Sequence, residues 1–277
     1  MIHSIKRRTL TISFSALLAL FALGDSVPAR AVPLFGADFQ LNRVVAASSD
    51  HLQLTSLQPF QRASAFMTTP LLLPPDASFE VRVGFQILGG SEGADGMTLT
   101  LLNGNPTHVG EAGGNLAFYP SAGTDGRPVP FGAALAIALD TWQNIAYGDV
   151  GANHVSLLDN TSYRARQSVA APFDLNDGDE HFLFASYSGP EQMLRVYLGD
   201  TAVKPETALL TESVDLSAWL HGSAKIGFTA ATGGSWNEHH VTEFSVTAMP
   251  EPGTLPLLAA GLAMVLRSVQ RRQVSKA

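Results

Sequence analysis

Residues 135–157 read LAIALDTWQNIAYGDVGANHVSL, which is two apolar runs joined by a polar loop. The full runs, Ala134–Asp140 and Asn153–Leu158, have the length and composition typical of buried β-strands. The loop between them is rich in Asp, Asn and Gly, the residues that turns prefer. The stretch therefore predicts a strand, a long polar loop and a second strand.

Similar strand-like runs recur on both sides of this stretch: Ser78–Ile87, Gly96–Leu102, His181–Ser188, Gln192–Leu198, Lys225–Ala230 and Val241–Thr247. Several of them, such as FEVRV at 79–83 and LRVYL at 194–198, alternate apolar with polar residues, which places one face on a core and the other in water. Helix signals are scarce, and Gly- and Asn-rich turns separate the runs. We therefore expect one all-β domain, a sandwich or a barrel, over residues 32–248.

The polar loop offers ligands that suit calcium. Asp140, Asn144 and Asp149 supply two carboxylates and an amide oxygen within ten residues. Calcium takes about six to eight oxygen ligands of these kinds. An Asx-rich surface turn, in which Asp and Asn bind their own backbone, explains the spacing equally well. The residues alone leave both interpretations open.

The same stretch resembles the metal loop of the legume-type (L-type) lectins, a strand with E-x-D-T followed by an aromatic residue, Asn, Asp and His. The match from Asp140 to His154 needs no gap. ADGMTL (94–99), GGNL (113–116), GFTAATG (227–233) and NEHHV (237–241) resemble further segments of that family in the same order. The likeness, from roughly Phe39 to Val246, implies a jelly-roll β-sandwich of the concanavalin A-like lectin type.

The resemblance implies metal ligands, namely two carboxylates, an amide oxygen, a backbone carbonyl and an imidazole: Asp140, Asp149, Asn144, Trp142 and His154. In the family, the two Asp residues hold calcium and also face a second, transition-metal site that the His completes. The family's glutamate two residues before Asp140 is Ala138 here. We therefore expect Ca²⁺ to be kept and Mn²⁺ or another transition metal to be weakly bound or absent.

The resemblance also implies a set of carbohydrate contacts: Asp95, Gly114, Trp142, Asn144, Gly234 and Ser235. Asp95, whose peptide bond to Ala94 is cis in the family, accepts hydrogen bonds from sugar hydroxyls. Gly114 and Asn144 donate, and the Trp142 ring stacks on the sugar's C–H face. Gly234 and Ser235 fall where the family varies its specificity. The implied function is calcium-dependent binding of a saccharide or exopolysaccharide, without enzyme activity, and the sequence does not name the sugar.

Both ends of the chain carry targeting patterns. Lys6-Arg7-Arg8 precedes an apolar run and Ala29-Arg30-Ala31, the order of a secretory signal peptide over residues 1–31. Residues 249–277 contain Pro250-Glu251-Pro252, an apolar run and a basic end. This order resembles the PEP-CTERM sorting signal of Gram-negative bacteria, which an exosortase-like machinery processes. A membrane anchor is the alternative at each end.

These end patterns predict an exported protein at the cell surface or in the extracellular matrix, with the tail in transient contact with the inner membrane. The formal net charge of −7 understates the acidity of the domain, because the two ends contain eight of the 17 Lys and Arg residues but only two of the 24 acidic ones. An acidic domain argues against a nucleic-acid partner. The chain has no cysteine, which excludes disulfides and thiol chemistry. An oligomer remains possible.

Two other functions fit the same fold. A glycoside hydrolase needs two carboxylates, about 5–5.5 Å apart in retaining enzymes, and sandwich hydrolases often place them on alternate residues of one strand. The predicted strands contain no such pair. A structural matrix protein that uses the lectin fold without sugar binding is the other alternative.

Three smaller motifs have simpler explanations. His239-His240 looks like a metal pair, but neighbours on a strand face opposite sides, which favours structural roles. Residues 174–180 (DLNDGDE) lack the full calcium-loop pattern, so a solvated turn is expected. Asn160-Thr161-Ser162 matches a glycosylation sequon and has little weight in a bacterial protein.

Overall fold

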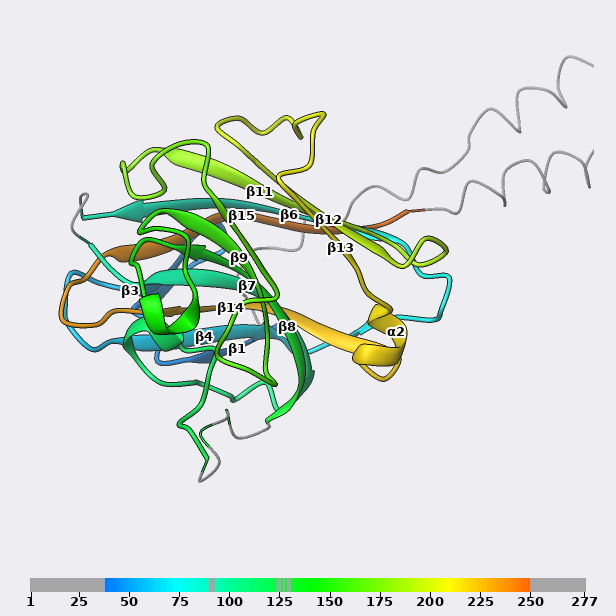
Figure 1. Ribbon diagram of the computed structural model, residues 1–277, viewed down its shortest axis with the longest axis horizontal. Helices are drawn as coiled ribbons and strands as arrows, with labels where there is room; N and C mark the ends of the chain where they lie inside the picture. Colours follow the sequence, from blue (N-terminus) through cyan, green and yellow to red (C-terminus); the bar gives the residue numbers. More distant parts are fainter. Residues whose placement is uncertain (1–37, 90–92, 124–125, 127, 129–130, 250–277) are drawn as a thin grey trace, which may run out of the picture. The chain divides into compact units, whose positions relative to one another are not determined.

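The computed structural model describes residues 38–89, 93–123, 126, 128 and 131–249. The predicted signal peptide and all of the predicted tail except Met249 lie outside this part. The described chain is almost entirely β-strand, arranged in two antiparallel sheets that pack as two layers (Figure 1). Within the described residues, no helix combines the length and the apolar character needed to cross a bilayer. The predicted all-β sandwich is confirmed.

The first layer is an eight-stranded sheet. Its strands in spatial order are β1 (Phe39–Asn42), β4 (Arg62–Met67), β14 (Ser223–Ala231), β7 (Gly96–Gly104), β8 (Gly132–Asp140), β9 (His154–Asp159) and β10 (Gln167–Ala170). A short strand, β5 (Leu71–Leu72), also pairs with β14. Strands distant in sequence, such as β4, β14 and β7, are therefore neighbours in this layer.

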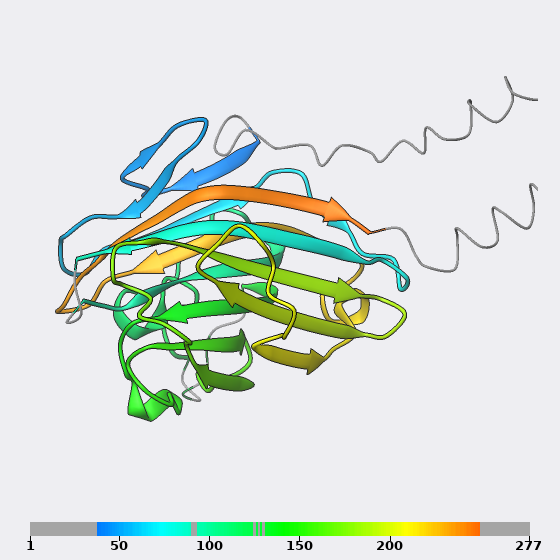
Figure 2. The ribbon, with the colours of Figure 1, turned by 90° about the horizontal axis from the view of Figure 1, so that it is seen from above.

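The second layer is a seven-stranded sheet. Its strands in spatial order are β13 (Leu210–Ser213), β12 (Met193–Gly199), β11 (Glu180–Ser188), β6 (Phe79–Leu88), β15 (Glu238–Ala248), β3 (Leu52–Thr55) and β2 (Ala46–Ala47). The long orange strand β15 runs alongside β6 in Figure 2. In the described part of the chain, three short helices lie in the connections: η1 (Gly113–Asn115), η2 (Ile145–Tyr147) and α2 (Leu216–Trp219).

The main core lies between the two sheets. On β6 the side chains of Val81, Val83 and Phe85 are fully buried, whereas the alternate residues Glu80 and Arg82 are only partly buried. The alternation seen in the sequence therefore marks the inner and outer faces of the seven-stranded sheet. The inner face packs against residues of β7 and β8, among them Leu99, Leu101, Leu135, Ile137 and Leu139.

Strand β8 is buried on both faces. Ile137 and Leu139 face the main core, while Ala136 and Ala138 belong to a second apolar cluster with Phe118 and other residues of the 116–119 segment. That segment covers the outer face of the eight-stranded sheet. Double burial explains why residues 134–139 read as a continuous apolar run rather than an alternating one.

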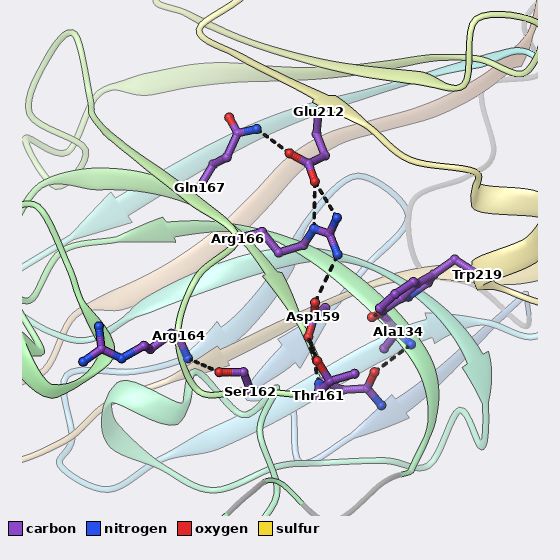
Figure 3. Close-up of polar contacts among 10 residues, drawn as sticks. Ala134, Asp159, Thr161, Ser162, Arg164, Arg166, Gln167, Glu212 and Trp219 are labelled. Atoms are coloured by element: carbon purple, nitrogen blue, oxygen red, sulfur yellow. Dashed lines mark hydrogen bonds and ion pairs between the residues drawn. The ribbon is translucent and has the colours of Figure 1, made fainter.

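An ionic cluster joins the two layers at one edge (Figure 3). Arg166, next to β10, donates from Nε to Oε1 of Glu212 on β13 at 2.9 Å, and its Nη1 lies 3.3 Å from Oδ2 of Asp159 on β9. Gln167 also donates to Glu212, and the guanidinium lies 5.4 Å from the ring centroid of Trp219 in α2. One arginine therefore connects β9, β13 and α2.

The strands that the sequence analysis missed are short or lie at sheet edges: β1, β2, β3, β4, β5, β10 and β13. Strand β4 (RASAFM) contains alanine and serine, which signal strand weakly, and its burial comes from β1 and β14 on its two sides. The eight predicted strands are all present, and no boundary differs by more than three residues.

Candidate metal and ligand site

The metal loop connects two adjacent strands. Strand β8 ends at Asp140 and β9 begins at His154, and these two residues are directly opposite each other in the antiparallel register. Opposed residues in such a pair project to the same face of the sheet. The loop between them includes η2 and returns Asp149 to the same place. One ligand atom from each of the three side chains lies within 4.8 Å of the others.

The three side chains are oriented toward one another without ordinary hydrogen bonds between them. Nε2 of His154 lies 3.5 Å from Oδ1 of Asp149 and 3.9 Å from Oδ2 of Asp140. Neither ring nitrogen of the buried His154 has a hydrogen-bond partner. Buried polar atoms normally have partners, so this arrangement of two carboxylates and an imidazole suits a cation between them.

The electrostatics of the cluster favour the same conclusion. Burial raises the pKa of Asp140 to about 8, because the charged carboxylate loses its hydration. Burial lowers the pKa of His154, but the Asp149 and Asp140 carboxylates outweigh that effect and raise it above its usual value. A bound cation would replace the lost hydration and hold the Asp140 carboxylate in its charged form.

One oxygen of each Asp carboxylate accepts a hydrogen bond from the backbone of the loop. Oδ1 of Asp140 accepts from the backbone N–H of Trp142 at 2.9 Å, and Oδ2 of Asp149 accepts from that of Asn144 at 2.6 Å. The first contact is an Asx turn, so the turn interpretation is correct for one oxygen of Asp140. The other oxygens face His154, and Oδ1 of Asn144 is buried without a partner.

Asp95 lies beside this loop. Its peptide bond to Ala94 is cis, as the resemblance implied. Its carbonyl accepts from the backbone N–H of Thr141 at 2.9 Å, and its own N–H donates to the carbonyl of Ala231 at 3.0 Å. The side chain is buried, its Oδ2 has no partner, and burial raises its pKa to about 7. Asp95 is thus an unpaired acceptor held next to the metal loop.

Two glycine loops approach these acceptors. A Cβ atom at Gly114 would lie 2.4 Å from Oδ1 of Asn144, and one at Gly233 would lie 2.8 Å from Oδ2 of Asp95. The N–H of Gly113 donates to the carbonyl of Thr232 at 3.0 Å, which ties the two loops together. Segments around residues 95, 114, 142 and 233 therefore meet at one place, although they are far apart in the sequence.

Gly234 and Ser235, the residues predicted to set sugar specificity, lie at the edge of the site that these segments form. Gly234 and Ser235 line a cavity of about 270 Å³ with Gly89, Gly93 and Trp236. No atom lies within 4 Å of a Cβ built at Gly234. Trp142 is 41% exposed, so its ring is available to a ligand, as is that of Trp236 at 42%.

Sequence reasoning missed Gly233 and Trp236 as neighbours of the site. The glycine pair and the adjacent tryptophan in GGSW (233–236) were the only available signals, and neither indicates contact with Asp95 or with the cavity. Asn237 also supports the site, because its side chain donates to Oγ1 of Thr141 at 3.4 Å.

Ala138 sits where the second metal's glutamate is expected. It is fully buried, lies two residues before Asp140 on the same face, and is flanked in register by Thr98 and Ser156. Its methyl group provides no ligand atom. The only grouping of three or more His, Cys, Asp or Glu ligand atoms among the described residues is Asp140, Asp149 and His154.

Two expectations for the smaller motifs are confirmed: residues 174–180 form turns, and His239 and His240 do not form a metal pair. Within residues 174–180, backbone N–H groups bind the Asp174 and Asp177 carboxylates two residues earlier, which is the pattern of Asx turns. His239 faces the core, with Nδ1 2.6 Å from Oγ1 of Thr55, whereas His240 is directed to the other face. The two histidines therefore do not share a ligand.

Comparison with curated proteins shows lectin relatives. L-type lectin-domain containing receptor kinase S.6 of Arabidopsis thaliana is 32% identical over 130 residues, which are 46% of this chain and 19% of that protein. A lectin-like protein of the same plant is 23% identical over 205 residues, 68% of this chain and 75% of that protein. The chain spans less than a third of the length of the receptor kinases it matches.

Solved structures share the fold. A lectin from Bauhinia forficata in complex with GalNAc superposes with a TM-score of 0.63 at 21% identity, covering 79% of this chain and 97% of that one. Arcelin-5, a lectin-like defence protein of Phaseolus vulgaris, gives 0.64 at 18%, with the same coverage. These values establish the legume-lectin sandwich. The sequence pattern of the legume lectin domain matches residues 34–256, and the chain therefore belongs to the legume lectin domain family.

Proposed function

We propose that the protein is a calcium-dependent lectin that binds a saccharide at the place where Asp95, Gly114 and Asn144 meet. The observation that carries this proposal is a pair of buried, unpartnered oxygen atoms, Oδ2 of Asp95 and Oδ1 of Asn144, next to the Asp140–Asp149–His154 cluster. Buried acceptors without partners are rare and call for a ligand or an ion. Relatives of the same fold have been solved with GalNAc and with galactose.

Calcium would be held by the carboxylates of Asp140 and Asp149, the amide oxygen of Asn144 and the backbone carbonyl of Trp142. The donors are hard oxygens, which calcium prefers. The ion would supply positive charge that keeps the buried Asp140 carboxylate ionised. His154 is then a nitrogen donor for a second ion, and with Ala138 in place of the glutamate we expect that site to bind Mn²⁺ weakly.

The sugar contacts follow from the orientation of the Asn144 amide. With its oxygen directed to calcium, its NH₂ is free to donate to a sugar hydroxyl. Asp95 accepts from two hydroxyls, and the Gly114 N–H donates to a third group. The exposed Trp142 ring covers the apolar C–H face of the sugar. Gly234 and Ser235, at the 270 Å³ cavity, are the contacts expected to select among sugars.

A glycan array probed with calcium and then with excess chelator tests the proposal. Binding that calcium restores and that Asp95→Asn abolishes is the expected result. The absence of a calcium-dependent signal on any glycan would instead favour a structural matrix protein with the same fold. Turnover of a polysaccharide that depends on one acidic side chain would indicate a hydrolase, whereas the lectin family and the lectin fold indicate a binding protein.

We further propose that the chain is exported, with residues 1–31 removed as a signal peptide, residues 32–248 forming the lectin domain, and residues 249–277 processed as a PEP-CTERM signal. The partners would then be an exopolysaccharide and an exosortase-like machinery. Mass spectrometry of the protein from surface and culture fractions of the native bacterium tests this. A full-length chain recovered from the cytoplasm would contradict it.

A further inference from the structure

A pair of histidines lies on the seven-stranded sheet and shares no residue with the proposed sugar site. Nδ1 of His240, on β15, lies 2.8 Å from Nε2 of His51, which precedes β3. The rings are in an edge arrangement, with centroids 4.7 Å apart. His240 lies opposite Gln53 on β3 and Gln86 on β6, so it occupies the outer face, unlike His239.

Glu238 determines how the His240 ring is protonated. Its Oε2 lies 3.1 Å from Nε2 of His240, and a carboxylate can only accept. The proton of a neutral His240 therefore resides on Nε2, and Nδ1 presents its lone pair toward His51. A carboxylate that accepts from the far nitrogen of a histidine is the usual companion of a metal-bound imidazole.

The facing nitrogens share a hydrogen bond, in which Nε2 of His51 donates to Nδ1 of His240, and a metal ion bound by both would replace that proton. Two nitrogens bound to one tetrahedral zinc at about 2.0–2.1 Å are separated by roughly 3.3 Å. The present 2.8 Å contact requires an opening of about half an ångström to admit the ion.

The turn that contains His51 holds it in place. The backbone N–H of Ser48 donates to the carbonyl of His51 at 2.8 Å, and that of Val45 donates to Gln53 at 2.9 Å. Ser48 and Asp50 in the same turn are exposed, which places this turn at the surface. From this arrangement we propose that His51 and His240 form a binding site for a zinc-class divalent transition-metal ion, with Glu238 as the positioning residue.

The test is calorimetric titration of the full chain with Zn²⁺ in saturating Ca²⁺. We expect one tightly bound zinc equivalent per chain, lost in His51→Gln and in His240→Gln and distinct from weak binding at the Asp140–Asp149–His154 cluster. His221→Gln, which removes an exposed histidine elsewhere, should retain it, as should Asp149→Asn, which disables the calcium loop. Glu238→Gln should weaken zinc about tenfold or more.

Electron paramagnetic resonance of Cu²⁺ bound in place of zinc provides a second readout. Hyperfine splitting from two imidazole nitrogens is expected in the wild-type chain and from one nitrogen in His51→Gln. If His240→Gln does not fold, His51→Gln still carries the test, because His51 lies in a surface turn. Zinc binding that survives His51→Gln, or that disappears in Asp149→Asn, would overturn the proposal.

Discussion

A Cβ atom at position 114 would lie 2.4 Å from Oδ1 of Asn144, so the Gly114 backbone and the Asn144 side chain occupy adjoining space with no room for a methyl group. The two residues come from different loops. Asn144 follows β8 and Gly114 lies in η1, so the contact exists only in the folded domain.

Replacing Gly114 with alanine should therefore displace the Asn144 side chain. We expect the affinity for the sugar to fall at least about tenfold, equivalent to about 1.4 kcal/mol. Isothermal titration with the best glycan from the array measures this. Gly151→Ala is the matched control, because no atom lies within 4 Å of a Cβ there. Equal losses in both variants would contradict the interpretation.

Removing calcium should destabilise the domain, because the buried Asp140 carboxylate then has no cation beside it. A ligand at about 100 times its dissociation constant stabilises by about 2.7 kcal/mol. For a domain of this size that corresponds to about 5–10 °C in melting temperature. Differential scanning calorimetry with and without chelator measures the difference. Asp149→Asn should melt at the same temperature in both conditions, and a calcium shift that survives in it would show that the ion binds elsewhere.

Replacing Ala138 with glutamate should restore the second metal site. The new side chain would lie on the face of Asp140 and His154, between the small residues Thr98 and Ser156. We expect the affinity for Mn²⁺ to rise at least about tenfold, because a carboxylate is added to the donor set. Ala138→Gln has the same length without the charge and should gain less. Manganese affinity that is unchanged in a folded Ala138→Glu variant would refute this assignment of the position.

His239 should make the domain sensitive to acid. Burial lowers the pKa of this histidine to about 3, below its usual 6.5. The unfolded chain therefore binds a proton that the folded chain does not, and stability falls as the pH drops from about 6.5 towards 3. This one group contributes up to about 1.4 kcal/mol per pH unit.

His239→Asn removes the titrating imidazole. The Asn amide can still pair with the Thr55 hydroxyl, because the hydroxyl contacts Nδ1, the ring nitrogen nearer the backbone. Urea unfolding between pH 7 and 4 should then give a flatter profile than the wild-type chain. The exposed His221→Asn provides the comparison variant. A slope that is the same in all three proteins would mean that other groups dominate the acid response.

Arg166 should contribute measurably to stability. Its side chain is 28% exposed and lies between the Asp159 and Glu212 carboxylates, which are 8% and 13% exposed. Arg166→Met preserves the aliphatic stem but leaves two largely buried carboxylates without their cation. We expect a loss of about 1–3 kcal/mol in urea unfolding. Arg195→Met, which breaks a more exposed pair with Glu191, should cost less than about 1 kcal/mol.

The sequence predicted much of the fold because the long central strands have recognisable local patterns of apolar residues. Val81, Val83 and Phe85 alternate with polar residues, and residues 134–139 form an unbroken apolar run. Short edge strands such as β10 and β13 have no such pattern, since their pairing depends on neighbours distant in sequence. The order of the strands within each sheet was likewise not readable.

The sequence by itself determined which carboxylate, amide and imidazole side chains the loop from Asp140 to His154 contains, and that Ala138 adds no carboxylate, because these residues lie within one strand–loop–strand unit. Only the tertiary structure decided which distant segments meet that loop. The contacts of Asp95 with Thr141 and Gly233, and of Gly114 with Asn144, join segments that the chain pattern does not relate. Long-range sheet pairing brings them together, and the same pairing places His51 beside His240.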